Sequence, residues 1–181
     1  MGVMSRHALA LLSEVIEPIG GVDYFAEIGV WKGHFCRQML RTKPNLFRKT
    51  YFGIDQWKSL DRRHGHMSKL NEDNWNELYY RSCLDMRYWP KLSILRLSSE
   101  EASKIFPDGF FDVVFIDASH FYDDVVNDIK LWMPKVKKGG YLTGHDISSK
   151  RHPEVTKAVE HFFGKNYKQV LDRAHIWIKQ I

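Results

Sequence analysis

Two short segments of the sequence combine acidic residues with histidines. Asp117-Ala118-Ser119-His120 follows one apolar run, and Thr143-Gly144-His145-Asp146 follows another. If these runs are neighbouring strands, they lie about 4.8 Å apart and bring the two acids to one rim. Paired carboxylates share a proton, bind a cation or orient cationic groups. Asp117 and Asp146 are therefore candidate cation ligands, and His120, which titrates near neutral pH, is a candidate general base.

These residues also have a structural interpretation. A single Asp after a strand commonly caps a helix, and His120 fits equally well as a surface residue at the start of a helix. The combination of two acids with two histidines favours a site. The other seven histidines are interpreted as structural or solvated.

A second informative group surrounds a glycine loop. Glu27 is followed by Gly29 and Gly33, and glycine allows a sharp turn and close approach to a ligand. The loop lacks the G-x-G-x-x-G pattern of dinucleotide binding. An acid beside it repels a pyrophosphate but attracts an ammonium or sulfonium group. The alternative is an ordinary strand-to-helix turn with a solvated Glu27.

Further polar residues follow the next two predicted strands. Asp55 ends one strand, where an acid can accept both hydroxyls of a ribose, although it could also cap a loop. Gln56 and Trp57 could border an adenine, and Trp57 fits a core position as well. The hydroxyl of Ser99 could bond the edge of an adenine.

Alternating apolar patterns predict the elements that position these residues. We expect helices over 4–15, 35–40, 72–85, 98–106, 125–133 and 155–163, and strands over 22–29, 51–55, 92–97, 113–116 and 141–145, followed by a hairpin of 167–171 and 174–178. Ser98 and Glu101 form a capping box, and Lys135–Gly140 is expected to close a helix. The alternation predicts an α/β fold with a doubly wound, mostly parallel sheet and an antiparallel C-terminal edge hairpin.

Composition narrows the class of protein. The 181 residues fit one domain, 1–181, and 44% apolar with 27% charged residues argues against disorder and coiled coil. We see no membrane-spanning run, no signal peptide and only two cysteines, so we expect a cytoplasmic protein without a membrane partner. The net charge of +5 is spread out, which favours a solvated surface over a nucleic-acid footprint.

With these residues in place, the chain resembles the class I S-adenosylmethionine-dependent methyltransferases, especially the branch with sugar and macrolide O-methyltransferases. The segment from Phe111 to His120, continuing through Gly139-Gly140 to His145-Asp146, carries the resemblance, which extends over roughly 23–163. It implies a single Rossmann-like domain with seven strands. It also implies cofactor contacts from Glu27, Gly29, Gly33, Asp55, Gln56, Ser99 and Asp117.

The resemblance further implies roles at the acid–histidine segments. In metal-dependent relatives, the acids matching Asp117 and Asp146 bind a divalent cation such as Mg²⁺, and the histidine matching His120 acts as base. Catechol-type relatives carry Asn directly after the second acid, where this chain has Ile147, so no third ligand is identified. Segments 1–17 and 56–75 are candidates for covering the substrate.

The sequence thus predicts O-methylation of a small hydroxylated substrate, a sugar being one candidate, with His120 and Asp117 as catalytic residues. One alternative is methylation of RNA or another macromolecule, which Arg62-Arg63-His64 favours slightly. Another is a non-catalytic protein that binds S-adenosylmethionine as a partner subunit, and homo-oligomers are compatible with either. A NAD-dependent oxidoreductase is disfavoured by the missing third glycine and by Glu27.

Overall fold

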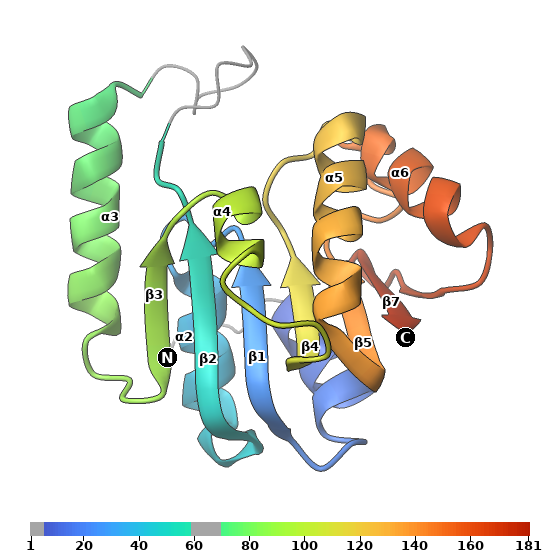
Figure 1. Cartoon of the computed structure of the whole chain (residues 1–181), viewed down its shortest axis with the longest axis horizontal. Coiled ribbons are helices and arrows are strands. Elements are labelled where there is room, and N and C mark those ends of the chain that lie inside the picture. The colour runs from blue at the N-terminus through green and yellow to red at the C-terminus, as the bar shows by residue number, and fades with distance from the viewer. Residues whose placement is uncertain (1–5, 59–69) are drawn as a thin grey trace.

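A seven-stranded sheet forms the centre of the computed structural model, which describes residues 6–58 and 70–181 (Figure 1). Its strand order is β3-β2-β1-β4-β5-β7-β6. The strands are β1 (Val22–Ile28), β2 (Phe47–Asp55), β3 (Leu92–Arg96), β4 (Phe111–Ile116), β5 (Val136–Gly144), β6 (Lys168–Val170) and β7 (Ile176–Gln180). β1 to β5 pair in parallel, whereas β7 is antiparallel to both β5 and β6. The predicted mostly parallel, Rossmann-like sheet is confirmed.

The chain changes direction across the sheet between β1 and β4. From β1 the chain proceeds to β2 and β3 on one side, and β4 then returns to pair with the other side of β1. Ile28 and Ile116, the last residues of the two strands, are partners in the register. In open α/β sheets such a reversal opens a crevice at the carboxyl ends, where ligands bind. The loops that follow Ile28 and Ile116 therefore begin side by side at this crevice.

Helices cover both faces of the sheet, as predicted. They are α1 (Arg6–Leu11), which continues as a π-helical turn over Leu12–Ile16, α2 (His34–Thr42), α3 (Glu72–Met86), α4 (Ser99–Ser103), α5 (Tyr122–Trp132) and α6 (Pro153–Phe163). Phe115 packs with the cluster of α1 and α2, whereas its neighbour Val114 packs with that of α4, α5 and α6. Successive strand residues point to opposite faces, so the apolar run of β4 is buried on both.

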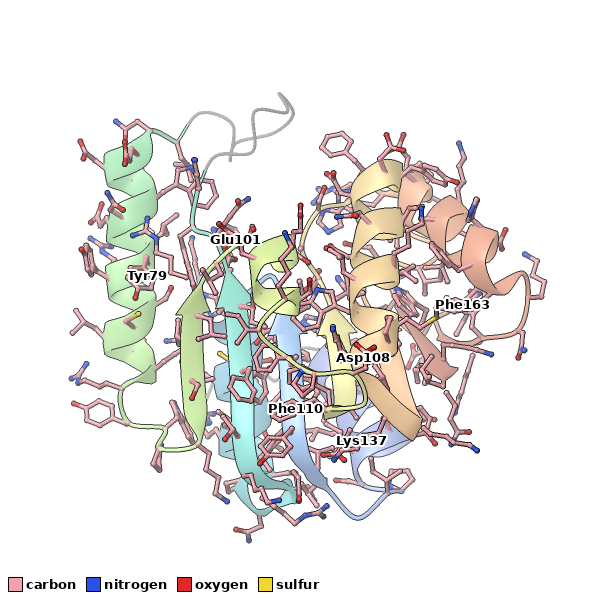
Figure 2. The ribbon with its side chains drawn as sticks, viewed as in Figure 1. Tyr79, Glu101, Asp108, Phe110, Lys137 and Phe163 are labelled. Carbon is pink, nitrogen blue, oxygen red and sulfur yellow. The ribbon has the colours of Figure 1, made fainter. Side chains whose placement is uncertain are left out.

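The long helix α3 stands beside the β3 edge of the sheet (Figure 1). Tyr79 lies on its sheet-facing side (Figure 2), where its ring is 5.1 Å from that of Trp57 and 4.7 Å from the guanidinium of Arg96. Asn71 caps the helix in a reciprocal capping box with Asn74. The predicted capping box of Ser98 and Glu101 is also present, at the start of α4.

Several predicted boundaries were wrong. β5 begins at Val136, so most of Lys135–Gly140 is strand rather than the end of a helix. The register with β4 shifts in this stretch, and Gly139 has a φ of +80°, so the glycines form an irregularity within a strand instead of a turn. The C-terminal hairpin is present, but β7 inserts between β5 and β6, which makes β6 the edge strand.

Parts of the predicted covering segments lie outside the described residues. These parts are 1–5 and 59–69, which include Arg62-Arg63-His64. Within the ranges that the structure describes, no helix has the length and apolar character needed to cross a membrane.

Candidate functional site

The loops after β1 and β2 form what we call the glycine-loop side of the site, comprising Glu27–Gly33 and Asp55–Trp57. Glu27 is only 1% exposed, so the interpretation of a solvated acid was wrong. Its Oε2 accepts a hydrogen bond of 2.7 Å from the hydroxyl of Tyr51. Burial raises the pKa of Glu27 well above its usual range, and this favours the neutral acid until a cation approaches.

Asp55 ties the end of β2 to the glycine loop. Its Oδ2 accepts from the backbone N–H groups of Val30 (3.0 Å) and Trp31 (2.8 Å), and its Oδ1 accepts from that of Trp57 (2.8 Å). An ionised carboxylate offers about four acceptor positions. Three are used within the chain, so the loop-capping interpretation describes this geometry, and one position is left for a ligand hydroxyl.

Gly29 brings the glycine loop against the loop after β4. It has a φ of +95°, and a Cβ placed on it would lie 2.2 Å from the carbonyl oxygen of Asp117. Gly33 has a φ of +65° and caps the N-terminus of α2. Gly29 therefore requires glycine, and Gly33 adopts the left-handed conformation that favours it.

A wide cleft of about 890 Å³ lies beside the glycine-loop side, between α3 and α4. Gln56 and Trp57 line it after β2, and Arg96 and Leu97 line it at β3. Its volume is in the range of small-molecule sites. Trp57 also belongs to the buried core and donates to the carbonyl of Trp31 at 2.8 Å.

Ser99 has its hydroxyl engaged within the protein. It donates to Oδ1 of Asp128 and accepts at 2.8 Å from the indole N–H of Trp132. Burial raises the pKa of Asp128 to about 7, although the bond from Ser99 opposes the shift. Ser99 thus joins α4 to α5, and its hydroxyl is not free for an adenine in this structure.

The loops after β4 and β5 form the histidine side, comprising Asp117–His120 and His145–His152. The backbone N–H of Asp117 donates to Ile28 at 2.8 Å, and that of His145 donates to Ile116 at 3.0 Å. Both loops are therefore fixed to strand ends. Asp146 has a φ of +59°, an uncommon conformation that is often associated with function.

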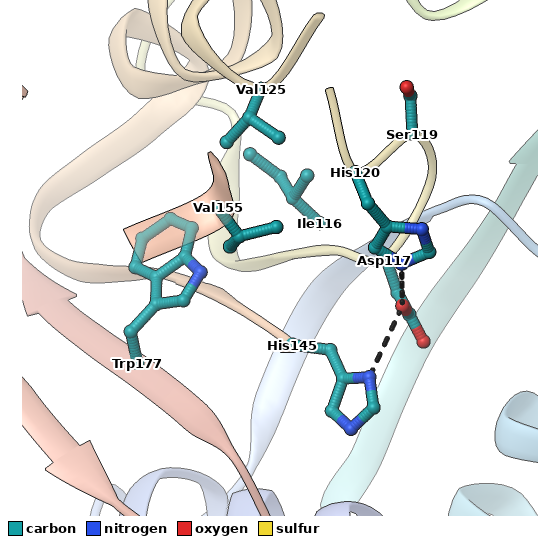
Figure 3. Close-up of a pocket in the computed structure, with 8 residues that line it drawn as sticks. All are labelled: Ile116, Asp117, Ser119, His120, Val125, His145, Val155 and Trp177. Atoms are coloured by element: carbon teal, nitrogen blue, oxygen red, sulfur yellow. Dashed lines mark ion pairs between the residues drawn. The ribbon is translucent and has the colours of Figure 1, made fainter. Parts of the chain in front are cut away.

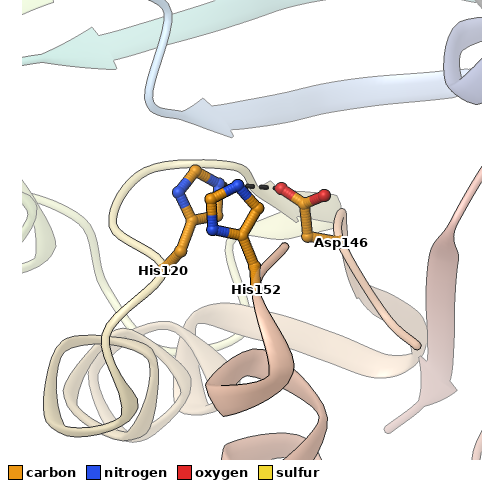
Figure 4. A group of neighbouring side chains, drawn as sticks. All are labelled: His120, Asp146 and His152. Atoms are coloured by element: carbon orange, nitrogen blue, oxygen red, sulfur yellow. Dashed lines mark ion pairs between the residues drawn. The ribbon is translucent and has the colours of Figure 1, made fainter. Parts of the chain in front are cut away.

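The structure brings the acids and histidines of this side together: Figure 3 shows Asp117 with His120 and His145, and Figure 4 shows Asp146 with His120. His120 Nε2 lies 2.9 Å from Asp146 Oδ2 and 3.8 Å from Asp117 Oδ1. His145 Nδ1 lies 3.4 Å from each of the same two oxygens. A cavity of about 10 Å³, close to the space of one water molecule, adjoins Asp117 and both histidines.

On the histidine side, ion pairs shift the pKa values of the ionisable groups more than burial does. Burial alone would lower the pKa of both histidines, but the contacts with the two carboxylates raise it to about 9 for His120 and about 10 for His145. Burial would raise the pKa of Asp117, but the imidazoles lower it to about 2, and they also lower that of Asp146. Two imidazolium groups thus balance two carboxylates, and His120 carries a proton at neutral pH in this state.

Two further histidines lie at the site, contrary to their interpretation as structural or solvated. The ring of His152 stacks on that of His120 at 4.0 Å and 24° (Figure 4). His7, on α1, has its ring 4.7 Å from that of His145. Two groups place three metal-ligating atoms within 4.8 Å of one another: Asp117, His145 and Asp146, and His120, Asp146 and His152. No spacing pattern in the sequence connects His7 or His152 with the acids.

Comparison with known proteins identifies a protein family that this chain matches. A family profile described as a methyltransferase domain matches residues 26–147, more than half of the chain. The uncharacterized protein R132 of Acanthamoeba polyphaga mimivirus is 40% identical over 143 residues, which cover 75% of this chain and 57% of R132. The uncharacterized protein y4gI of Sinorhizobium fredii is 28% identical over 102 residues, which cover 56% of this chain and 10% of y4gI. The chain thus spans only part of the length of these relatives.

Solved structures share the fold at low sequence identity. The O-methyltransferase NovP aligns with a TM-score of 0.63 and 17% identity, covering 96% of this chain and 77% of NovP. CalS11, a TDP-rhamnose 3′-O-methyltransferase of calicheamicin biosynthesis, aligns with a TM-score of 0.64 and 12% identity, covering 98% of this chain and 81% of CalS11.

Proposed function

The chain belongs to the methyltransferase domain family, and on that premise we propose that it transfers the methyl group of S-adenosylmethionine to a hydroxyl oxygen of a small molecule. The family match confirms the resemblance to class I S-adenosylmethionine-dependent methyltransferases. The observation that carries the proposal is the contact of Gly29 with Asp117, because it joins a glycine loop to a cluster of acids and histidines.

In this proposal, the glycine-loop side holds the cofactor. Glu27 is a buried carboxyl with a raised pKa, and the positive charge of the methionine part would favour its ionised form. Gly29 and Gly33 allow the loop to approach the ligand closely. Asp55 has one acceptor position left for a ribose hydroxyl.

The remaining predicted cofactor contacts surround the cleft and the loop after β4. Gln56 lines the cleft and would border the adenine, while Asp117 would face the transferred methyl group. Ser99 would support the adenine subsite through Asp128 and Trp132, because its hydroxyl is already bonded to them.

The chemistry needs alignment and removal of a proton. A sulfonium methyl is already activated, so the enzyme mainly positions the acceptor oxygen in line with it. His120 would accept the hydroxyl proton, which requires the neutral imidazole. Its pKa of about 9 depends on Asp117 and Asp146, so positive charge placed between these carboxylates would lower that pKa towards neutrality.

A divalent cation such as Mg²⁺ would supply positive charge between Asp117 and Asp146. Asp117 and Asp146 present carboxylate oxygens to the same point, since His145 Nδ1 lies 3.4 Å from an oxygen of each. Such hard oxygen donors are typical ligands of divalent cations. When bound, the cation would polarise the substrate oxygen and lower the pKa of its hydroxyl.

The acceptor that we favour is a small hydroxylated molecule, with a sugar as one candidate. The fold shared with NovP and with CalS11, a TDP-rhamnose methyltransferase, supports this choice. Methylation of RNA is the alternative, and the basic stretch that would favour it lies outside the described residues.

Calorimetric titration with S-adenosylmethionine tests the cofactor site. Asp55→Ala should weaken binding by tenfold or more, since hydrogen bonds to charged groups contribute about 1.5–3 kcal/mol. Asp108→Ala is the matched control, because Asp108 is exposed and pairs with Lys135 far from the loop. Unchanged affinity in a folded Asp55→Ala variant would contradict the assignment.

Release of S-adenosylhomocysteine, measured with a panel of nucleotide sugars, macrolides and catechols, tests the reaction. With an accepted substrate, His120→Ala should lower turnover about 10²–10⁴-fold and leave cofactor affinity nearly unchanged. His34→Ala, at the exposed start of α2, is the control. If His120→Ala stays within a few-fold of the parent, His120 is not the base. A parent that binds the cofactor but releases no product with any acceptor, RNA included, would support the non-catalytic alternative.

A further inference from the structure

The position that supplies a ligand in catechol-type relatives is closed in this chain. Ile147, which follows Asp146 directly, is completely buried and apolar, and it packs in the core cluster of α4, α5 and α6. Its backbone N–H donates to the carbonyl of His175 at 3.0 Å. A third protein ligand must therefore come from another position.

His145, on the other side of Asp146, occupies such a position. Its Nδ1 lies 3.4 Å from Asp117 Oδ1 and 3.4 Å from Asp146 Oδ2, and the ligand atoms of all three residues lie within 4.8 Å of one another. Adjacent ligands of an ion held at about 2.1 Å are separated by about 3 Å. Each carboxylate oxygen therefore lies only a few tenths of an ångström beyond this separation from His145 Nδ1.

The backbone fixes these ligands without help from an ion. Asp117 and His145 are the first residues after β4 and β5, and each is bonded through its N–H to the strand beside it. Asp146 has a φ of +59°, and its ligand oxygen lies within 4.8 Å of that of Asp117. The site is therefore largely organised before an ion binds.

The kind of donor atom decides which ion such a site prefers. Carboxylate, carbonyl and water oxygens suit Mg²⁺, whereas an imidazole nitrogen suits Mn²⁺, Fe²⁺, Co²⁺ and Zn²⁺ better in rising order of affinity. We propose that His145 is the third ligand beside Asp117 and Asp146, and that the site consequently binds a divalent transition-metal ion in preference to Mg²⁺. This inference rests on the proposed function, which it deepens by naming the ligand set and the class of ion.

A competing group of donors shares Asp146. His120 Nε2 is buried and has no hydrogen-bond partner among the described residues, although Asp146 Oδ2 is 2.9 Å away, and His152 lies beside it (Figure 4). An ion held there would use His120 as a ligand and prevent it from acting as base. The two groups share only Asp146; His145 belongs to one and His152 to the other, so variants of these two residues separate them.

The test is direct metal binding to the full chain, freed of metal by chelation, with neither cofactor nor substrate added. Calorimetry with Co²⁺, Mn²⁺ and Mg²⁺, together with the visible absorption of bound Co²⁺, should show Co²⁺ binding at least about tenfold more tightly than Mg²⁺. His145→Asp converts the ligand set to oxygen alone. It should weaken Co²⁺ binding by about tenfold or more and change the Co²⁺ spectrum, while Mg²⁺ binding is retained or strengthened.

His152→Ala is the matched control and should leave the affinity and spectrum of Co²⁺ unchanged. Loss of Co²⁺ binding in His152→Ala, with His145→Asp unaffected, would overturn the proposal in favour of the competing group. An equal preference for Mg²⁺ and Co²⁺ in the parent would also overturn it. Thermal unfolding of each variant shows whether it is folded. Because metal binding is measured without cofactor, a failure of the proposed methyl transfer is recognised separately.

Discussion

The glycine-loop side and the histidine side each hold two acids, but they satisfy these acids in different ways. Asp55 accepts three backbone N–H groups, and Glu27 accepts the hydroxyl of Tyr51. On the histidine side, Asp117 and Asp146 face imidazole rings. Backbone amides and a buried tyrosine keep their protons near and above neutral pH, whereas these imidazoles release theirs as the pH rises through about 9 and 10.

The hydrogen bonds on the glycine-loop side are therefore permanent, whereas the protons on the histidine side are exchangeable. The hydrogen bonds of the glycine-loop side are part of the fold, so they define the loop before any ligand binds. The protons of the histidine side can leave as the pH rises or be displaced by a metal ion. An acid with main-chain partners therefore shapes a site, and an acid with titratable partners is available for chemistry.

The largest expected effect concerns the contact between the two sides. Gly29→Ala should lower the free energy of unfolding by about 4 kcal/mol or more, because its Cβ would lie 2.2 Å from the carbonyl oxygen of Asp117 at a φ of +95°. Urea unfolding measures it. Gly109→Ala, where φ is +66° but nothing lies within 4 Å, should lose only about 1–2 kcal/mol. Equal losses in both variants would mean that the close contact is unimportant.

A second variant tests Asp128, a buried acid whose partner is neither a backbone amide nor an imidazole but the hydroxyl of Ser99. Asp128 has a pKa of about 7, raised from 3.8 by burial, so the folded protein binds its proton more tightly than the unfolded chain. Its contribution to stability is therefore full below pH 4 and is lost as the pH rises to 7. Asp128→Asn should be more stable than the parent by about 3 kcal/mol at pH 8, with little gain at pH 4. Thermal unfolding at both pH values shows this, and a gain independent of pH would contradict it.

The third prediction concerns the exchangeable side in the presence of a chelator. The pKa values of His120 and His145 are raised from 6.5 to about 9 and about 10, so they stabilise the fold fully below pH 6.5 and lose this effect as the pH rises through 9 and 10. Asp146→Asn should flatten the decline of stability between pH 7 and 10 by about 2 kcal/mol. Urea unfolding at several pH values measures the slope. Asp23→Asn, which removes a partly exposed acid paired with Arg48 away from the histidines, should keep the parental slope.

The smallest expected effect concerns the hydrogen bond between Tyr51 and Glu27 on the glycine-loop side, and tests whether it is independent of pH. Tyr51→Phe removes the hydroxyl that donates to Glu27, and should lower the free energy of unfolding by about 1–2 kcal/mol. Because burial raises the pKa of Glu27 well above its usual range, the loss should change little with pH where an exposed glutamate would ionise. A loss that grows with pH would show that Glu27 ionises and that this side is also exchangeable.

Local patterns in the sequence predicted much of the fold. The apolar run Val113–Ile116 indicated a strand buried on both faces, and Ser98 with Glu101 indicated the start of α4, because both signals lie within a few residues. The start of β5 was missed because Gly139-Gly140 favours a turn locally, whereas pairing with β4 keeps it extended. Tertiary pairing there overrides local preference.

The candidate site was predicted where strand order alone determines it. Asp117 and Asp146 meet because β4 and β5 are neighbours. The places of His7 and His152 depend on how α1 and the start of α6 pack over the sheet, which no spacing encodes. The bonds of Ser99 with α5 likewise arise from packing between helices that are distant in sequence.

The close approach of Gly29 to Asp117 also has a thermodynamic consequence for ligands. Because Gly29 lies against the backbone of Asp117, a ligand that orders the glycine loop also restricts the loop after β4. A ligand that orders Asp117 restricts the glycine loop in the same way. Two ligands that each bind the ordered state share the entropy lost in reaching it. The nucleoside cofactor and the proposed cation should thus bind with positive cooperativity, and linkage requires that each raise the affinity of the other by the same factor.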